Sequence, residues 1–205
     1  MSMRRISGLL PLLLSSLLVL VFSTASPVLA ASGTSAHFTF HGLTAFAEFD
    51  TYSPNGCVET FVYVDGTHSH NYTVGDVFIG QFDYCTQTLL LSAFGSASNP
   101  NFQIDKKLGS ASLNTTIPVT DYVSGNTFNV SISVTWTAID ALMHENGSFH
   151  FHSKGFIDNS HFNAGFRDAN ASGTVSDGTT NYTPDSALYA QLASMKSGDV
   201  FITHP

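Results

Sequence analysis

The sequence predicts an all-β protein built as a single antiparallel β-sandwich of about ten strands, Greek-key, immunoglobulin-like or jelly-roll-like, with an open barrel as the nearest alternative. Three observations predict this class. Residues 128–136 are apolar at every even position and polar at every odd one, the pattern of a strand with one buried face. Turn-forming Gly, Asn, Asp and Ser residues separate the apolar stretches. No stretch shows a convincing helical period.

Residues 1–30 have the features of a cleaved secretory signal peptide. Arg4 and Arg5 form a positive start, Leu9 to Phe22 is largely apolar, and Ala30 ends a tolerated cleavage site. An uncleaved anchor is the alternative, but the apolar run is shorter than the roughly 20 residues that cross a bilayer. We therefore expect a secreted, extracellular protein with one β-sandwich domain over residues 31–205.

The two cysteines, Cys57 and Cys85, are expected to form a disulfide in an oxidising compartment. Placing them opposite each other pairs Val58 with Tyr84 across two antiparallel strands, with a loop over residues 65–76. This register puts Glu59 opposite Asp83, which is unfavourable for two like charges. Closing the loop should stabilise the fold by roughly 3 kcal/mol.

The second half of the chain contains a predicted hairpin and one ambiguous segment. Alternating residues 113–119 and 128–136 are joined by a turn at 123–126, and Trp136 falls on the apolar, core-facing side. Residues 186–196 could form a helix. We favour a hairpin instead, in which residues 187–195 turn at 197–199 into residues 200–204.

Histidines provide the sharpest candidate site. His150 and His152 alternate with phenylalanines and should share one strand face, and His161 follows after a turn. Three imidazoles converging from two strands suit Zn or Cu, with Asp158 as a fourth ligand or as a hydrogen-bond acceptor that orients one of the imidazoles. The alternatives are surface histidines without metal, on a strand whose Phe149 and Phe151 face the core, or a pH-sensing cluster. His37 with His41, and His68 with His70, form two further pairs.

Residues 149–155, followed by His161-Phe162-Asn163, locally resemble the copper-site strand of Cu/Zn superoxide dismutases, which are also β-sandwiches. The resemblance implies a copper site at these histidines. However, the family's zinc loop is missing and its later arginine motif comes too soon at Asn163 to Arg167. We therefore do not infer superoxide dismutase activity from this resemblance.

Composition limits the remaining functions. The chain has 15 acidic and only seven basic residues, for a net charge of -8. This charge excludes non-specific electrostatic binding to nucleic acid. Glu48, Asp50 and Glu59 suggest a solvated strand face rather than a glycosidase pair. Six N-glycosylation sequons are possible modification sites: Asn71, Asn114, Asn129, Asn146, Asn170 and Asn181.

No catalytic motif is present. We therefore expect a secreted, non-enzymatic module with no cofactor and a surface, matrix or ligand-binding role. Its partner would be an unknown extracellular ligand or surface, with no nucleic acid and no membrane contact after signal cleavage. The alternative is a metal-binding protein or metalloenzyme that uses His150, His152 and His161 for Zn or Cu.

Overall fold

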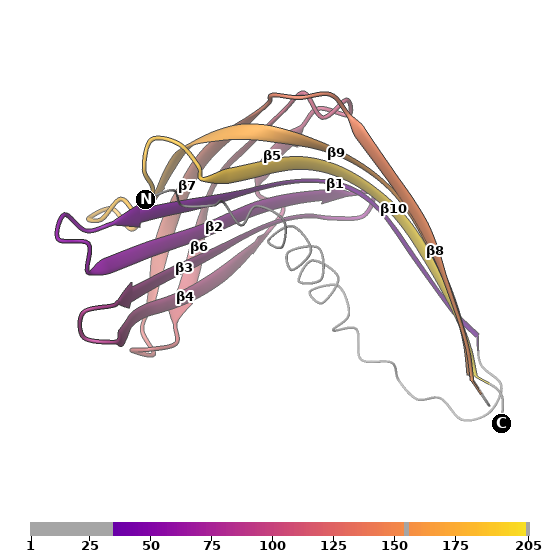
Figure 1. Ribbon diagram of the computed structural model, residues 1–205, viewed down its shortest axis with the longest axis horizontal. Helices are drawn as coiled ribbons and strands as arrows, with labels where there is room; N and C mark the ends of the chain where they lie inside the picture. Colours follow the sequence, from indigo (N-terminus) through magenta and orange to yellow (C-terminus); the bar gives the residue numbers. More distant parts are fainter. Residues whose placement is uncertain (1–34, 154–155, 204–205) are drawn as a thin grey trace, which may run out of the picture.

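The computed structural model describes residues 35–153 and 156–203, and it confirms the all-β class (Figure 1). The predicted signal peptide, residues 1–30, lies outside the described residues. All the strand pairs are antiparallel, and the strands are β1(Ser35–Tyr52), β2(Val58–Ser69), β3(Thr73–Asp83), β4(Thr88–Ser98), β5(Asn101–Ile104), β6(Ser110–Asp121), β7(Thr127–Ala138), β8(Met143–Ser153), β9(Phe156–Ser176) and β10(Tyr189–Thr203). Within these ranges, no helix has the length and apolar character to cross a membrane.

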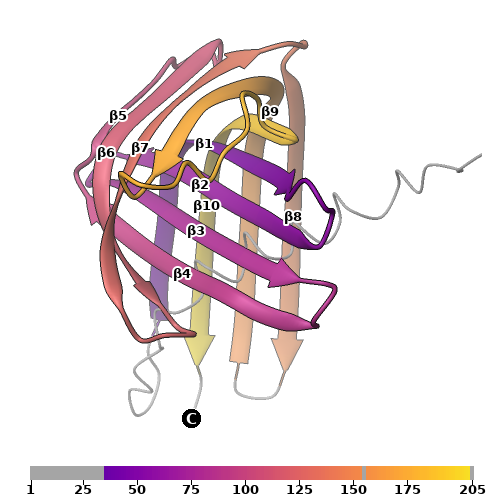
Figure 2. The same cartoon turned by 90° about the vertical axis from the view of Figure 1, so that its left-hand side faces the viewer.

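The strands form one sheet that bends into two facing layers around the core. Its order is β10-β1-β2-β3-β4-β6-β7-β9-β8, with β5 beside β6 and an additional pairing between β9 and β10. The layer made by β1 to β4 packs against the layer made by β5, β6, β7 and the second half of β9, as Figure 2 shows. This arrangement is consistent with a β-sandwich.

Strand β7 has the predicted alternation of buried and exposed residues. Val130, Ile132, Val134 and Trp136 are buried, and the intervening residues are exposed. The Trp136 side chain is 1% exposed, and its Nε1 donates a 2.8 Å hydrogen bond to the Phe46 carbonyl oxygen on β1. This bond satisfies the indole inside the core and joins the two layers. The hairpin between β6 and β7 is also confirmed.

The sheet turns its sharpest corner between β4 and β6. These strands share only two paired positions, Ala93 with Asp121 and Phe94 with Thr120. Gly95 lies where the strands cross, and a Cβ there would overlap the Pro118 carbonyl oxygen. A residue without a side chain is therefore needed for the close approach.

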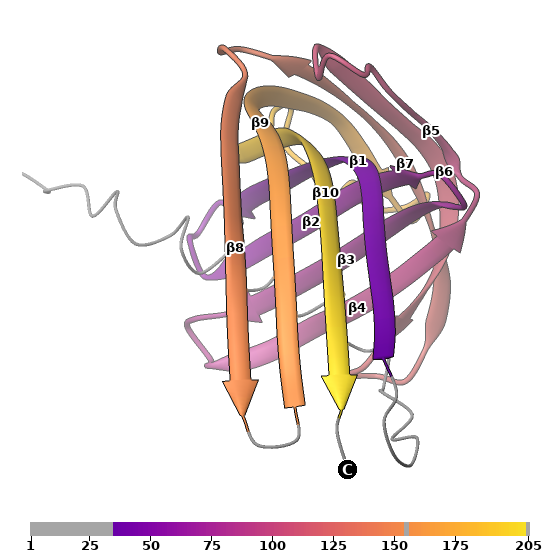
Figure 3. The same cartoon turned by 90° about the vertical axis from the view of Figure 1, so that its right-hand side faces the viewer.

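Four strand segments extend beyond the two-layered body, and we call them the extension. They are residues 143–153 of β8, 156–166 of β9, 195–203 of β10 and 35–41 of β1, paired in that order. Figure 3 shows them side by side, and Figure 1 shows them curving away from the body. They form one layer of sheet.

The predicted hairpin over residues 187–204 is wrong, and so is the helix alternative. Residues 189–203 form the single strand β10, which pairs with β1 on one side and with β9 on the other. Ser197, Gly198 and Asp199 looked like a turn, but with neighbours on both sides their backbone groups complete two strand ladders.

The Cys57–Cys85 disulfide is confirmed, with a Cα–Cα distance of 5.3 Å. The predicted register is wrong by one residue, because Val58 pairs with Asp83 and Val64 with Val77. The shift places Glu59 opposite Phe82 and removes the expected clash with Asp83. The predicted 65–76 loop is also too long, since β2 continues to Ser69 and β3 begins at Thr73.

Glu59 gains two favourable partners in the observed register. Its carboxylate accepts hydrogen bonds from the hydroxyls of Tyr52 at 2.6 Å and Tyr84 at 2.5 Å. These bonds lower the pKa of Glu59, and the bond to Glu59 is the main reason that the pKa of Tyr52 rises to about 12. The acid expected on a solvated face is therefore tied into the disulfide end of the sheet.

Candidate binding surfaces of the sheet extension

The pairing of the extension separates its side chains into two chemically different faces. Cross-strand partners in an antiparallel sheet share a face, and successive residues alternate between faces. Phe149 pairs with Ser160, whereas His150 pairs with Asn159. Every other residue of β8 therefore belongs to an aromatic face, and the residues between belong to a histidine face.

The aromatic face is rich in exposed apolar side chains. Phe149 is 56% exposed, Met143 49%, Phe151 46% and Phe162 38%. The Phe149 and Phe151 rings stack, with centroids 6.5 Å apart. The Phe162 ring lies over Gly147, at the position a side chain would occupy. We define the aromatic face by these residues together with Phe40 and Phe166, which share it by register.

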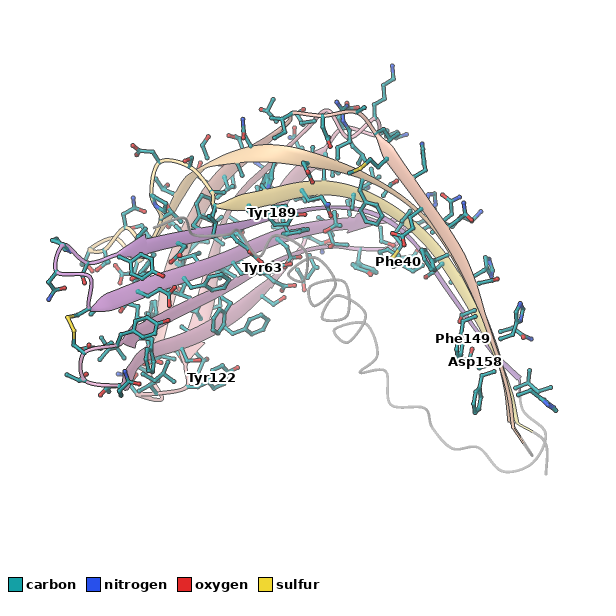
Figure 4. All side chains as sticks on the ribbon, in the orientation of Figure 1. Phe40, Tyr63, Tyr122, Phe149, Asp158 and Tyr189 are labelled. Atoms are coloured by element: carbon teal, nitrogen blue, oxygen red, sulfur yellow. A yellow bond between two sulfur atoms is a disulfide. The ribbon has the colours of Figure 1, made fainter. Side chains whose placement is uncertain are left out.

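This face lies on the inner side of the curved extension. Figure 4 shows Phe40 and Phe149 there, with Asp158 beside Phe149. Asp158 is opposite Phe151 in the β8–β9 pair, and its Oδ1 atom is buried without a hydrogen-bond partner. The suggestion that Asp158 is a fourth metal ligand is therefore wrong, because its backbone register places it on the face opposite His150.

The same side of the sheet continues onto the body as a second aromatic group. Phe46 on β1 packs against Tyr63 on β2 at 6.0 Å and against Tyr189 on β10 at 5.5 Å, between ring centroids. Burial raises the pKa of Tyr63 and Tyr189. Figure 4 places both tyrosines over the β1–β2–β10 region of the body.

Carboxyl groups lie beside these body aromatics. Asp65 pairs directly with Asp76 across β2 and β3. Burial, reinforced by the negative charge of Asp76, holds the pKa of Asp65 well above its usual range. Burial also raises the pKa of Glu48 and of Asp76. Burial at these positions destabilises the ionised form of a carboxyl group and so favours its neutral form.

The histidine face combines imidazoles with neutral polar groups. His144, His150 and His152 come from β8 and His161 from β9, and all are exposed. The His150 Nδ1 atom lies 2.8 Å from the Asn159 Oδ1 atom of the neighbouring strand. The His161 ring lies over Gly198 of β10. On β1, His41 pairs with Lys196.

At its base the histidine face reaches a pocket of about 530 Å³. His41 from β1, His68 from β2 and His70 from the following turn line the pocket, together with Lys106. The His68 Nδ1 atom lies 2.9 Å from the Thr73 Oγ1 atom. His41 from one predicted pair thus lines the same pocket as His68 and His70, which form the other pair. The side chain of His37 lies outside the described residues.

The predicted metal ligands share a face but do not form a compact ligand set. His150, His152 and His161 lie on the same side of β8 and β9. In the described part of the chain, only Cys57, Asp83 and Cys85 bring three His, Cys, Asp or Glu ligand atoms within 4.8 Å of one another. Those cysteines form the disulfide, so that group is not an imidazole site.

The six predicted sequon asparagines are all exposed, at 71, 114, 129, 146, 170 and 181. The aromatic face was missed at the sequence level because we assigned Phe149 and Phe151 to the core. The available signal is that β8 and its partner β9 are both rich in phenylalanine.

The arrangement offers two separate binding chemistries, one apolar and one rich in imidazole. The Cys57–Cys85 disulfide is compatible with an extracellular protein. Comparison of the chain with protein-family models, curated proteins and solved structures gives no match.

Proposed function

We propose that the protein is a secreted, non-enzymatic binding module whose aromatic face docks on an apolar protein surface. The exposure of Phe149, Phe151 and Phe162 on a one-layer sheet is the observation that supports this proposal most strongly. A sheet with one apolar face is normally covered by a second layer. Exposed apolar patches of this kind mark interaction sites.

The dimensions of the extension suit a protein partner. Four strands spaced by about 4.8 Å and about ten residues long span roughly 600 Å² of sheet plane. A standard interface covers about 800 Å² on each partner. The extension alone therefore approaches the area of one side of a standard interface. A second copy of the chain is the partner that can be tested without further knowledge.

Titration with Nile red, a neutral dye that fluoresces on apolar surfaces, tests the proposal. We expect the variant Phe149→Gln/Phe151→Gln to show much less Nile red fluorescence than wild type, with both proteins comprising residues 31–205. His150→Gln/His152→Gln changes the same strand on the other face and should keep the signal. If wild type is a dimer, the phenylalanine variant should sediment as a monomer. A monomeric wild type with the same dye signal as the phenylalanine variant would refute the docking surface.

Metal binding is a second candidate function, favoured by the shared face of His150, His152 and His161. Side-chain rotation would have to bring the three imidazoles together, because they do not lie within mutual ligand distance. Metal analysis of untagged protein decides this candidate. One Zn or Cu per chain, lost in His150→Ala/His152→Ala, supports it, and no metal with no thermal shift on its addition excludes it.

A further inference from the structure

The charges of the protein are distributed unevenly over the extension. The chain has 15 acidic residues, yet none of the described positions on the histidine face carries a carboxyl group. Glu145 and Asp158 both fall on the aromatic face of the extension. On the extension, the histidine face carries imidazoles, the Lys196 ammonium group and neutral side chains, and Lys106 adds a second ammonium group at the pocket.

The groups that set the charge of this face come from every neighbouring strand. They are His41 on β1, His68 and His70 at the pocket, His144, His150 and His152 on β8, His161 on β9, Lys196 on β10 and Lys106 in the turn after β5. Arg167 at the base of β9 donates to the backbone oxygen of Asp140 and is occupied there. Asp105, next to Lys106, accepts hydrogen bonds from the backbone N–H groups of Lys107 and Gly109.

Most of the neutral side chains between the histidines are amides and hydroxyls, and Ile157, opposite His152, is an apolar exception. Asn146 pairs with Asn163, and Ser148 pairs with His161, on the same face. Such groups donate to and accept from sugar hydroxyls. Carboxylates on a polymer would find imidazolium and ammonium partners beside them. The spacing along four strands suits an extended chain rather than one small ion.

We propose that the histidine face binds an acidic polysaccharide, and that it binds more tightly as the pH falls below neutral. Imidazole is the side chain whose charge ordinarily changes between pH 5 and 8. His41, His144, His150, His152 and His161 supply this group to the face. The carboxylates of a uronic-acid polymer remain largely ionised over that range. The pocket of His41, His68, His70 and Lys106 brings three imidazoles and an ammonium group together at one end of the face. This site is independent of the docking role of the aromatic face.

Polygalacturonate binding tests the proposal, with neutral dextran as the reference polymer and metal-stripped buffer throughout. We expect wild type to bind polygalacturonate about tenfold more tightly at pH 5.5 than at pH 7.5, and to bind dextran at neither pH. His150→Gln/His152→Gln should weaken binding about fivefold at pH 5.5 and leave pH 7.5 unchanged. Thr135→Gln/Thr137→Gln changes two exposed positions of β7 on the body, outside both faces of the extension, and is the control that should bind like wild type.

Several results would overturn the proposal. They are no polygalacturonate binding at pH 5.5, equal affinity at the two pH values, equal affinity for dextran, or an unchanged pH response in the histidine variant. Circular dichroism of both variants verifies that the sheet is intact. The dye signal of the aromatic face is measured on the same samples. A failure of this site can therefore be distinguished from a failure of the docking surface.

Discussion

Phe149 and His150 are neighbours in the chain, but they lie on opposite faces of a sheet that is one layer thick. The Phe149 ring stacks on Phe151, whereas the His150 imidazole meets Asn159 of the next strand. In a sandwich, one of these faces would be covered by a second layer. In the extension both faces meet the surroundings, which makes strand β8 a place where two kinds of ligand can bind independently.

Asp158 limits how apolar the aromatic face can be. Its Oδ1 atom is buried without a hydrogen-bond partner, and the desolvation of such an oxygen costs about 1–3 kcal/mol. We expect Asp158→Leu to raise the Nile red signal and the melting temperature. Asn163→Leu, on the histidine face, is the control and should change the dye signal little. An unchanged or weaker signal in Asp158→Leu would contradict the assignment of Asp158 to the aromatic face.

Asp65 should make the fold less stable as the pH rises. Its pKa is raised in the folded protein by burial and by Asp76, so the folded chain retains a proton that the unfolded chain loses. The free energy of unfolding therefore falls as the pH rises from the ordinary aspartate value through the raised one. Asp65→Asn should increase the melting temperature at pH 7.5 and increase it much less at pH 4.5.

Asp83 provides a control of opposite sign. Hydrogen bonds from Thr86 and Cys85 lower its pKa, so its contribution is present at neutral pH and is lost as the pH falls through the lowered value. Asp83→Asn should therefore lower the melting temperature at pH 7.5. Thermal melts by circular dichroism at the two pH values measure both variants. An equal gain for Asp65→Asn at both pH values would be inconsistent with a raised pKa.

Trp136 should be the most costly single core side chain to shorten on β7. Trp136→Phe leaves the Phe46 carbonyl without its 2.8 Å donor and opens space between the layers. We expect a loss of about 2–4 kcal/mol in the free energy of unfolding. Urea denaturation followed by far-ultraviolet circular dichroism measures it, with Thr137→Ala on the exposed side as the control. A loss below about 0.5 kcal/mol, the size of a surface change, would contradict the role of the indole.

Removal of the disulfide should destabilise the protein without changing its fold. Cys57 and Cys85 are 28 residues apart, and the chain-entropy model gives about 3.5 kcal/mol for a loop of this size. Cys57→Ser/Cys85→Ser should therefore melt about 10 °C below wild type. Addition of a reductant should lower the melting point of wild type to that of the variant. A reductant effect on the variant itself would show that the measured loss has another source.

Alternation within a strand could be predicted from the sequence, and pairing between strands only in part. The buried face of β7 and the position of Trp136 follow from period two alone. The register of β2 on β3 does not, because a slip of one residue still leaves apolar residues opposite one another. In the observed register Glu59 is not opposite Asp83, and its carboxylate accepts hydrogen bonds from Tyr52 and Tyr84.

The sites depend on long-range pairing that local patterns do not encode. Ser197, Gly198 and Asp199 resemble a turn, and only two flanking strands keep them extended. The shared face of His150 and His152 follows from spacing, and the addition of His161 needs the β8–β9 register. His41 lies near His68 because the pairing of β1 with β2 begins directly after His41, with Gly42 opposite Ser69 and Leu43 opposite His68. Local sequence patterns also do not indicate whether a second layer of sheet covers the aromatic face.

The most direct test of the two-faced extension is a paired comparison on strand β8. Phe149→Gln/Phe151→Gln and His150→Gln/His152→Gln are each measured for Nile red fluorescence and for polygalacturonate affinity at pH 5.5. We expect the phenylalanine variant to lose the Nile red signal and to keep its polygalacturonate affinity. We expect the histidine variant to keep the Nile red signal and to bind polygalacturonate about fivefold more weakly. If either folded variant lost both signals, or if neither variant lost any, the two faces would not be separate binding surfaces.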